Sequence, residues 1–388
     1  MAAAALAAPT SGPKPWSFFT NNTILTTSGN YSVTYPRSVE FMDGTILATT
    51  AYSGPHPPYF PIFSSPDGGA SWQHISNLTD QVNGVGFGSQ PAITQLPYPL
   101  GGYPAGTIVA GGNSAGPNFT RIDLYASTDG AKTWEFVSHV AEGGKANTTN
   151  GATPFWEPYF LRVSAGGPSA DLVRPYHNQR VAYYSDQRDP LHGQKLSHQV
   201  SDDLKNWGPV VNDVAYDEYI ARPGMTNIAH IEPIDKWILV HERPIGNWSS
   251  YGVNYPVYYV IADNPLEFGQ NTDTPLVVNN TLAPNASPYV AWSPVGGPNG
   301  TIVVSDADNR GVFTNQAGSD VSKWELHDTP AGSVYSRAIQ IFKRRPDHLL
   351  IYGGDTYNGR AAGVHAPLSA TVVDLHKVLK APNTEYTP

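Results

Sequence analysis

Short apolar runs recur along the whole chain and predict β-strands. Clear examples are TILATTAY, RVAYYSD, KWILVHE, VYYVIAD and HLLIYGG. Each run is rich in β-branched and aromatic residues and is bounded by Gly, Pro, Asn or Asp, which favour turns. Only the segment VVDLHKVLKAP, near the C-terminus, suggests a helix. The pattern therefore predicts an all-β fold.

The predicted strands repeat in six segments that share one order. Each segment has a first strand, a turn, a strongly apolar strand, and a strand that ends in a polar turn before Trp or Phe. The six first strands are YPRSVEF, SQPAITQL, WEPYFLRV, RPGMTNIAH, SPYVAWSP and YSRAIQIF. Repeats of this kind are typical of β-propellers, so we expect a six-bladed β-propeller with four antiparallel strands per blade. The first strands should be innermost, and the early strand TILTTSG should complete the last blade.

We expect residues 16–388 to form this single domain. Residues 1–15 begin MAAAALAAPTSG and are interpreted as the remnant of a signal peptide or as a tag. No apolar run approaches the roughly 18 residues needed to span a bilayer, so we expect no association with a membrane. We also expect the protein to be a monomer.

Two turn motifs support the propeller. SPDGGASW (Ser65–Trp72) and STDGAKTW (Ser127–Trp134) fit Ser-x-Asp-x-Gly-x-Thr/Ser-Trp, the second with Ala131 at the glycine position, and SDDLKNW and SDVSKW look like degenerate copies. They resemble the Asp-box of sialidase-type propellers, which lies on outer hairpins far from the substrate. We therefore expect Asp67 and Asp129 to bond the backbone of their turns. Calcium binding is the alternative, but few carboxylates cluster there.

Composition points to a carbohydrate ligand. Charged residues make up 14% of the 388 residues, against about 25% in an average domain, while the chain has 22 Tyr and 9 Trp. Sugars suit such surfaces, because their CH faces stack on rings and their hydroxyls pair with amides. The net charge of −9, without a basic run, argues against nucleic acid.

The compartment is indicated by glycosylation sequons. Nine Asn-x-Ser/Thr sequons occur, at Asn21, Asn30, Asn77, Asn118, Asn147, Asn247, Asn279, Asn285 and Asn299. Their density favours a secreted, extracellular glycoprotein. The chain has no cysteine, so disulfides give no information on the compartment and thiolate metal sites are excluded.

Two glutamates stand in settings that could support acid–base chemistry. Glu157 lies between a Trp and a Pro in GATPFWEPYF, where loss of hydration should raise its pKa and suit a proton donor. Glu242 ends an apolar strand beside His241 and Arg243, and is expected to stay ionised. Glycoside hydrolysis needs one carboxyl group in each state. The residues alone leave another interpretation open, in which backbone amides tether Glu157 and Glu242 is a solvated salt-bridge partner.

Longer motifs carry a family resemblance. WEP, AYYSDQRDPLHGQKLSHQVSDDLKNWG, VAYDEYIARPGMT and WILVHE together resemble glycoside hydrolase family 93, the exo-1,5-α-L-arabinanases, from about Arg37 to Arg337. The resemblance implies a six-bladed propeller that releases arabinobiose from the non-reducing end of linear arabinan, with retention. The two catalytic glutamates of the family fall on Glu157 and Glu242. Their sequence settings favour Glu157 as acid/base and Glu242 as nucleophile, and the reverse assignment stays open.

Further residues are candidates for binding the sugar. They are Arg37, Arg222 and Arg337 at the starts of innermost strands, Asp186 and Arg188 in YSDQRD, Tyr335, which resembles a pocket tyrosine of the family, and Trp156 and Trp248 as stacking platforms. Each also has a structural interpretation: salt bridges between blades for the three arginines, a turn cap and a surface cation for the YSDQRD pair, and core packing for the tryptophans. No phosphate loop or metal-binding spacing occurs, so no cofactor or metal is expected.

The chain departs from the family pattern between Phe160 and Val181, where LRVSAGGPSADLVRPYHNQR is longer than expected. The family also more often has Tyr before the second glutamate, where this chain has His241. Exo action needs a cleft blocked at one end, and the Phe160–Val181 insertion and the Gly246–Gly252 loop are candidates for that role.

Two other functions fit parts of the pattern. The Asp-boxes suggest a sialidase, in which Arg37, Arg222 and Arg337 would hold a substrate carboxylate. A non-catalytic carbohydrate-binding propeller would show similar aromatic residues and would need no acidic pair.

Overall fold

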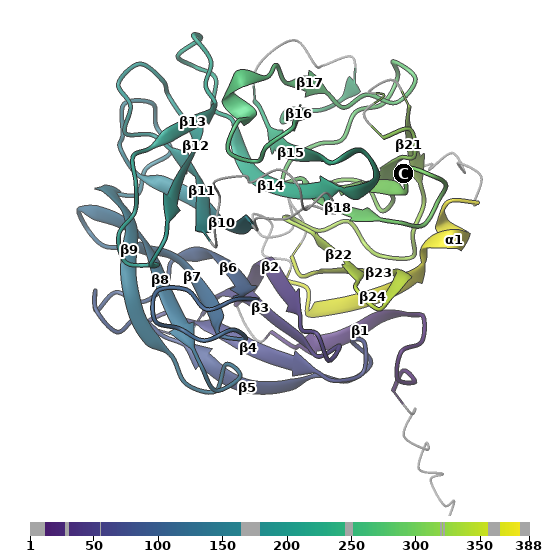
Figure 1. The fold of residues 1–388 in the computed structure, drawn as a ribbon, viewed down its shortest axis with the longest axis horizontal. Helices are drawn as coiled ribbons and strands as arrows, with labels where there is room; N and C mark the ends of the chain where they lie inside the picture. The colour runs from purple at the N-terminus through teal and green to yellow at the C-terminus, as the bar shows by residue number, and fades with distance from the viewer. Residues whose placement is uncertain are drawn as a thin grey trace, which may run out of the picture.

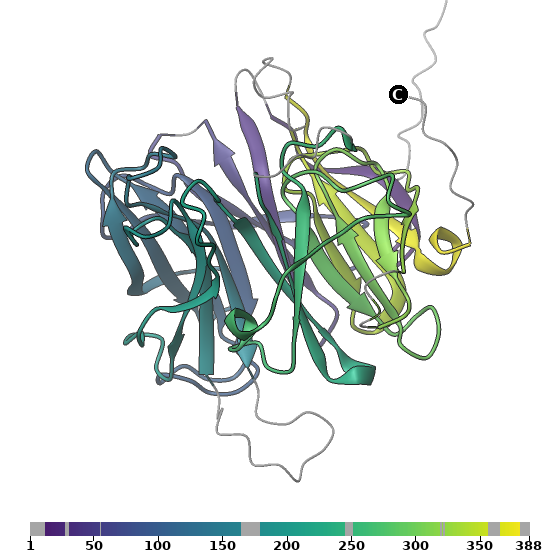
Figure 2. The same cartoon turned by 90° about the horizontal axis from the view of Figure 1, so that it is seen from above.

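The computed structural model describes residues 12–27, 31–54, 56–163, 179–244, 251–318, 320, 323–355 and 365–380. The strands in these ranges form six antiparallel sheets of four strands each, set around a common axis (Figure 1). Seen from the side, the strands run between the two faces of a disc (Figure 2). The structure confirms the six-bladed β-propeller.

Each blade is one run of consecutive strands, except the last. Blade one is β2 (Ser32–Glu40), β3 (Ile46–Ser53), β4 (Phe60–Ser65) and β5 (Gln73–Leu78). Blade two is β6 (Ser89–Gln95), β7 (Ile108–Ala115), β8 (Phe119–Ser127) and β9 (Glu135–Gly144). Blade three is β10 (Phe155–Val163), β11 (Gln179–Asp186), β12 (Lys195–Ser201) and β13 (Val211–Val214).

Blade four is β14 (Gly224–Ile231), β15 (Lys236–Glu242), β16 (Val257–Ala262) and β17 (Thr274–Pro275). Blade five is β18 (Tyr289–Ser293), β19 (Thr301–Ser305), β20 (Val312–Asn315) and β21 (Trp324–His327). Blade six combines β22 (Ala338–Phe342), β23 (Arg345–Gly353) and β24 (Leu368–Asp374) with β1 (Phe19–Leu25). The helical pieces are η1 (Glu232–Ile234), η3 (Phe268–Gln270) and α1 (Leu375–Val378).

The first strand of the chain closes the ring, as the sequence predicted. β1 pairs antiparallel with β24, with Asn22 opposite Ala370 and Leu25 opposite Leu368. The strand begins earlier than expected, at Phe19. Just before it, the backbone N–H of Trp16 donates to the Asp67 carbonyl at 2.9 Å and holds the N-terminal segment against blade one.

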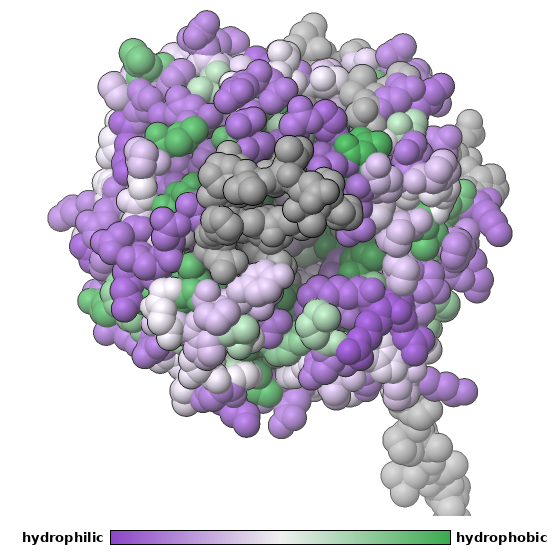
Figure 3. Space-filling model, viewed as in Figure 1, coloured by the Kyte–Doolittle hydropathy of each residue, from purple (hydrophilic) through white to green (hydrophobic). Residues whose placement is uncertain are grey.

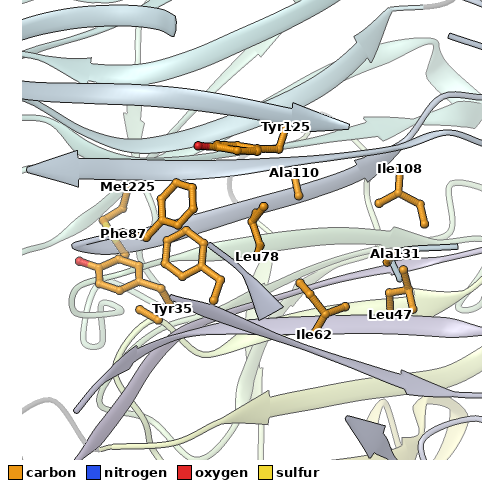
Figure 4. Packing of buried hydrophobic residues seen from close by; sticks show 12 residues of the cluster. Tyr35, Leu47, Ile62, Leu78, Phe87, Ile108, Ala110, Tyr125, Ala131 and Met225 are labelled. Atoms are coloured by element: carbon orange, nitrogen blue, oxygen red, sulfur yellow. The ribbon is translucent and has the colours of Figure 1, made fainter. Parts of the chain in front are cut away.

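Hydrophobic side chains pack between neighbouring blades. Among the described residues, six clusters form, one at each boundary between adjacent blades. In the cluster between blades one and two, Leu47 and Ile62 face Ile108 and Tyr125 (Figure 4). Because each sheet is covered on both faces by its neighbours, the apolar β-branched runs of the sequence are buried on both sides.

The innermost strands share an unusual backbone feature at one end. Each has a non-glycine residue with positive φ within its first four residues or two residues before its start: Tyr35 (51°), Gln90 (61°), Glu157 (60°), Met225 (65°), Ser287 (40°) and Ser336 (51°). In blades one to four the pairing register shifts at this position, which marks a β-bulge. A bulge with a left-handed residue redirects the side chain, and such positions are enriched next to active sites. We call these six the axial residues.

The Asp-boxes are structural. Ser65 Oγ donates to Asp67 Oδ1 at 2.9 Å, and the carboxylate accepts the Ser71 N–H at 2.9 Å, in the hairpin between β4 and β5 at the edge of the disc. Asp129 repeats these bonds between β8 and β9. Ala131 has φ 68°, which explains why glycine is usual at that position of the motif.

The surface is mostly polar. Hydrophilic side chains predominate on the face shown in Figure 3, with apolar side chains scattered among them. Within the described ranges, no helix has the length and apolar character needed to cross a bilayer.

Candidate active site

Glu157 is the axial residue of blade three and is held by three blades. Its backbone N–H donates to Oε1 of Gln90 in blade two at 3.0 Å. Its Oε2 accepts the hydroxyl of Ser185 in its own blade and the backbone N–H of Met225 in blade four, each at 2.7 Å. These bonds fix the carboxyl group at the axis of the ring.

Glu242 reaches the same place from the second strand of blade four. It ends β15, opposite Gly224 at the start of β14. Its Oε2 accepts the backbone N–H of Ser287, the axial residue of blade five, at 2.6 Å. The carboxyl group therefore bridges the boundary between blades four and five.

The two carboxyl groups face each other across Gly224. A Cβ atom at Gly224 would lie 3.2 Å from Oε2 of Glu157 and 3.7 Å from Oε1 of Glu242. Since both oxygens lie this close to one point, they are less than about 7 Å apart, a range that includes the roughly 5–5.5 Å separation of retaining glycosidases. The two glutamates that the sequence analysis paired, 85 positions apart in the chain, therefore lie close together in the fold.

Burial raises the pKa of both carboxyl groups, although each keeps some exposure to the cavity. For Glu157, the Met225 and Ser185 hydrogen bonds and the charges of Arg37 and Arg222 oppose the rise. For Glu242, the negative charge of Glu157 adds to burial and raises the pKa to about 8, opposed only by the Ser287 N–H. Because the two charges repel, the pair holds one proton near neutral pH.

The expectation that polar neighbours keep Glu242 ionised is wrong. His241 points to the opposite side of β15, where its Nε2 lies 3.4 Å from Asp273. The Arg243 guanidinium lies over the ring of Tyr216, 3.8 Å from its centre. Neighbours along a strand point to opposite faces, so adjacency in the sequence did not become contact in the fold.

A cavity opens around the carboxyl pair. Its volume is about 350 Å³, within the usual range for small-molecule sites. It is lined by Tyr35, Gln90, Thr148, Trp156, Glu157, Gln194, Arg222, Glu242, Pro244, Tyr255, Ala286 and Tyr335. Aromatic rings and amide or hydroxyl groups are thus presented together, as an uncharged sugar requires.

One wall of the cavity is a polar network. Oε1 of Gln187 accepts the indole N–H of Trp156 at 2.6 Å and an N–H of Arg222 at 2.9 Å. Arg222 also donates to Oε1 of Gln194 at 2.8 Å. Trp156 and Arg222, both candidates from the sequence, therefore lie in the cavity wall in fixed orientations.

A tyrosine pair forms another wall. The hydroxyl oxygens of Tyr335 and Tyr35 are 3.0 Å apart, and their rings meet edge to face at 5.4 Å. Burial raises the pKa of both hydroxyls, and the carboxylates of Glu157 and Glu242 raise it further. Both tyrosines therefore stay protonated. One hydroxyl donates to the other, which leaves one O–H of the pair to donate to another acceptor.

Arg37 and Arg337, which the sequence suggested as sugar-binding residues, make their described contacts outside the cavity lining. Arg337 is fully buried and donates to the carbonyls of Arg310 and Gly311 in blade five, the first at 2.9 Å. Arg37 donates to the Pro36 carbonyl at 2.7 Å and lies over the ring of Tyr289. Neither lines the cavity, and the charge of Arg37 reaches Glu157 only through the electrostatic field. Arg337 has the bonding expected of a residue that joins blades, whereas the hydrogen bond of Arg37 stays within its own strand.

The remaining sequence-based candidates for sugar binding lie away from the cavity lining or outside the described residues. Asp186 and Arg188 form a two-pronged ion pair, with Nη2 to Oδ2 at 2.8 Å and Nε to Oδ1 at 3.0 Å, behind the ring of Phe155 and away from the cavity lining. Trp248 lies outside the described residues, as does most of the Phe160–Val181 insertion. The strands flanking that insertion end at Val163 and Gln179, the end of the hairpin remote from Glu157. The expected role of the insertion at the cleft has no support in this placement.

Several cavity residues were missed by the sequence analysis. Gln90, Tyr35 and Ser287 directly precede the prolines Pro91, Pro36 and Pro288, as Glu157 precedes Pro158. Aligning the repeats on these prolines would have placed them with Glu157 at the axis. Ser185 and Gln194 carried no such signal. Among the described residues, no group of His, Asp or Glu side chains is placed to hold a metal ion.

The chain is similar to two solved arabinan-degrading enzymes. A GH93 α-L-arabinofuranosidase of Fusarium graminearum in complex with arabinobiose is 40% identical, with a TM-score of 0.85 over 93% of this chain and 99% of that one. This chain belongs to glycoside hydrolase family 93. A Penicillium chrysogenum α-L-arabinanase complexed with arabinobiose is 36% identical, with a TM-score of 0.83 over the same shares of the two chains.

The similarity to more distant solved structures is one of fold alone. A sialidase from Streptococcus pneumoniae shares 9% identity and a TM-score of 0.59, over 96% of this chain and 72% of that one. No protein-family model and no curated protein sequence matches the chain. As a member of family 93, the protein is a glycoside hydrolase.

Proposed function

We propose that the protein hydrolyses linear α-1,5-L-arabinan from the non-reducing end and releases arabinobiose. The observation that carries the proposal is the pair of partly buried glutamates on either side of Gly224, inside a cavity rich in aromatic and amide groups. The Fusarium and Penicillium relatives, both solved with arabinobiose, supply the substrate class.

The proposed reaction retains the anomeric configuration. Glu157 protonates the leaving oxygen while Glu242 attacks the anomeric carbon, and a covalent glycosyl-enzyme forms. Glu157 then takes a proton from the water that hydrolyses this intermediate. The bound of about 7 Å on the two carboxylate oxygens admits the 5–5.5 Å separation of retaining enzymes.

The charges of the empty site, taken alone, favour the reverse roles. Glu157 has two hydrogen bonds and two nearby arginines that stabilise its charge, whereas Glu242 has a single N–H donor. A coupled pair redistributes its proton when a substrate arrives, and a proton on Glu157 removes the repulsion that raises the pKa of Glu242. The assignment that we propose follows the apolar sequence setting of Glu157 between Trp156 and Pro158, and trapping with azide tests it against the reverse assignment.

A sialidase function has little support. Sialic acid would need arginines gathered around its carboxylate, but Arg337 bonds to carbonyls of blade five and Arg37 lies outside the cavity lining. Only Arg222 of the three lines the cavity.

We also propose that the protein is secreted and glycosylated. Of the seven sequon asparagines that the structure describes, five are exposed: Asn21, Asn77, Asn118, Asn147 and Asn279. Asn285 is an exception, because its side chain is buried and accepts the backbone N–H groups of Asn254 and Tyr255. A mass shift after enzymatic removal of N-glycans, mapped to the exposed sites, tests this part.

The product profile on debranched arabinan tests the activity. Arabinobiose as the sole early product supports the proposal, and a ladder of products or free arabinose contradicts it. Glu157→Gln and Glu242→Gln should abolish release while leaving the fold intact, with the exposed Glu232→Gln as the control.

A further inference from the structure

Three apolar side chains are exposed beside the cavity. Leu191 is 73% exposed, Ile220 is 61% exposed and Tyr219 is 39% exposed. They lie on two loops of blade three, at 187–194 and 216–223. Each loop also supplies a residue to the cavity wall, Gln194 from the first and Arg222 from the second. The exposed group therefore continues directly from the cavity.

Each loop is a closed turn. In the first, the His192 N–H donates to the Asp189 carbonyl at 3.2 Å, and Lys195 pairs with the Asp189 carboxylate at 2.6 Å. In the second, the Ala221 N–H donates to the Glu218 carbonyl at 2.9 Å, which places Tyr219 and Ile220 at the two central positions. Turn tips are normally polar, so large apolar residues there are unusual.

The two turns are also tied to each other. The Gly193 N–H donates to the Tyr219 carbonyl at 2.9 Å, and His192 Nδ1 donates to the Tyr216 carbonyl at 2.7 Å. Arg222 donates to the Gly193 carbonyl at 3.1 Å and thereby joins both turns to the cavity wall. The exposed side chains stand on one braced platform, so little backbone ordering is needed when a ligand binds.

Tyr219 lies at the rim of the cavity. Its hydroxyl is 3.9 Å from the position of a Cβ at Gly151, on the loop that also supplies Thr148 to the cavity lining. Its hydroxyl also interacts electrostatically with Arg222. The tyrosine thus spans the mouth between the 145–154 loop and the Arg222 wall.

We propose that Tyr219, Ile220 and Leu191 bind the arabinan chain beyond the scissile bond, the part that leaves as the shortened polymer. The inference rests on the proposed function. When the non-reducing end fills the cavity, the remaining chain must leave through its mouth, where these residues are exposed. Arabinan is uncharged and presents CH faces, which suits an aliphatic and aromatic platform better than a charged one.

The test compares two substrates that differ only beyond the scissile bond. An aryl α-arabinobioside has no sugar on the leaving side, whereas α-1,5-arabinohexaose has several. Tyr219→Ala should lower kcat/KM for the hexaose about tenfold, the effect of losing one aromatic stacking contact, and leave the aryl substrate within about twofold. Ile220→Ser is the second variant, and its high exposure makes unfolding unlikely to confound it.

The matched control is Tyr98→Ala. Tyr98 is 50% exposed and lies in the β6–β7 turn, at the end of that hairpin opposite the axial residue Gln90. The Tyr98→Ala substitution should change kcat/KM for neither substrate. An equal loss on both substrates, or no loss for Tyr219→Ala and Ile220→Ser, overturns the inference. A wild-type protein inactive on both substrates overturns the proposed function, and this inference with it.

Discussion

The backbone N–H of Met225 donates to Oε2 of Glu157 at 2.7 Å, across the boundary between blades three and four. The same kind of bond recurs around the axis. The N–H of Glu157 donates to Gln90, that of Tyr35 to Ser336, and that of Ser336 to Ser287. Each is a left-handed residue whose N–H is accepted by a side chain of the preceding blade.

Glu242 supplies the corresponding acceptor at the boundary between blades four and five. The axial residue of blade four is Met225, whose side chain is a poor acceptor, and the N–H of Ser287 is accepted instead by Glu242. Both proposed catalytic carboxyl groups therefore belong to the bonding that joins the blades. The same bonds hold the pair in position for reaction.

Gly224→Ala should lower activity without unfolding the protein. The new Cβ would lie 3.2 Å from Oε2 of Glu157, so the carboxyl group must shift away from the Met225 and Ser185 donors. A misplacement of about 1 Å can cost about 10²-fold in kcat/KM, so the smaller shift required here should cost about three- to tenfold. Gly332→Ala, where a Cβ would meet no atom within 4 Å, is the control. Equal kinetics in the two variants would contradict the tight packing of the pair.

Azide should distinguish the roles of the two glutamates. Glu157→Ala and Glu242→Ala should each lose about 10²–10⁴-fold in kcat on arabinan. With an activated aryl arabinobioside and azide, the acid/base variant yields the α-azide and the nucleophile variant the β-azide. We expect the α-product from Glu157→Ala and the β-product from Glu242→Ala, measured by NMR. Exchanged products would show that the roles are reversed.

Activity should fall above about pH 8. The reaction needs one proton on the pair, and the pKa of Glu242 is raised to about 8 by burial and by the charge of Glu157. Loss of that proton leaves two carboxylates and no acid, and a second proton at low pH leaves no nucleophile. A bell-shaped profile of kcat/KM is expected on the aryl arabinobioside. A profile that stays flat to pH 10 would exclude the shared proton.

The stability of the fold should depend on pH through Glu242. A carboxyl group whose pKa rises from 4.5 to about 8 on folding favours the folded state below pH 4.5, and this stabilisation is lost as pH rises through 8. Glu242→Gln removes the buried charge, so its advantage over the wild type should grow from pH 5 to pH 9. The gain is on the order of a few kcal/mol in unfolding free energy at most. Thermal unfolding at both pH values checks it, with Glu232→Gln unchanged.

Asp67→Ala should weaken the fold and spare the chemistry. The side chain accepts the Ser65 hydroxyl and the Ser71 N–H in an outer hairpin, far from the axial residues. Loss of these bonds should cost about 1–3 kcal/mol in urea unfolding. At a temperature where both proteins are folded, kcat/KM should equal that of the wild type. A loss of activity in the folded variant would mean that the Asp-box influences the geometry of the active site.

The fold followed from the sequence because its signals are local. Strand periodicity and turn residues lie within one repeat and recur in each blade. A proline stands at or near the start of the innermost strand in five of the six blades. The pair of glutamates was found because each sits in a short distinctive motif, WEP or HE. Their separation could not be derived, since it depends on Gly224 having no side chain in a third segment.

Errors arose where the direction of a side chain mattered. His241 and Arg243 were taken as neighbours of Glu242, but the pleat turns them to the opposite side of the strand. Arg37 and Arg337 stand near axial positions, yet their guanidinium groups bond to backbone carbonyls, that of Arg37 to Pro36 in its own strand and that of Arg337 to Arg310 in blade five. A one-residue change of position relative to the bulge decides whether a side chain reaches the axis.

The chain's two extremes share one sheet, since β1 lies against β24 and the Asn21 N–H donates to the Thr371 hydroxyl oxygen at 3.0 Å. During synthesis the opening strand must therefore wait without its partner until nearly all of the polypeptide has left the ribosome. The propeller ring is then closed by side-chain packing and hydrogen bonds alone, with no covalent link between β1 and β24. In circular permutants that open the chain at another blade, β1 and β24 would be close in sequence and could pair early. Their refolding rates would show how much the late pairing of β1 with β24 slows folding.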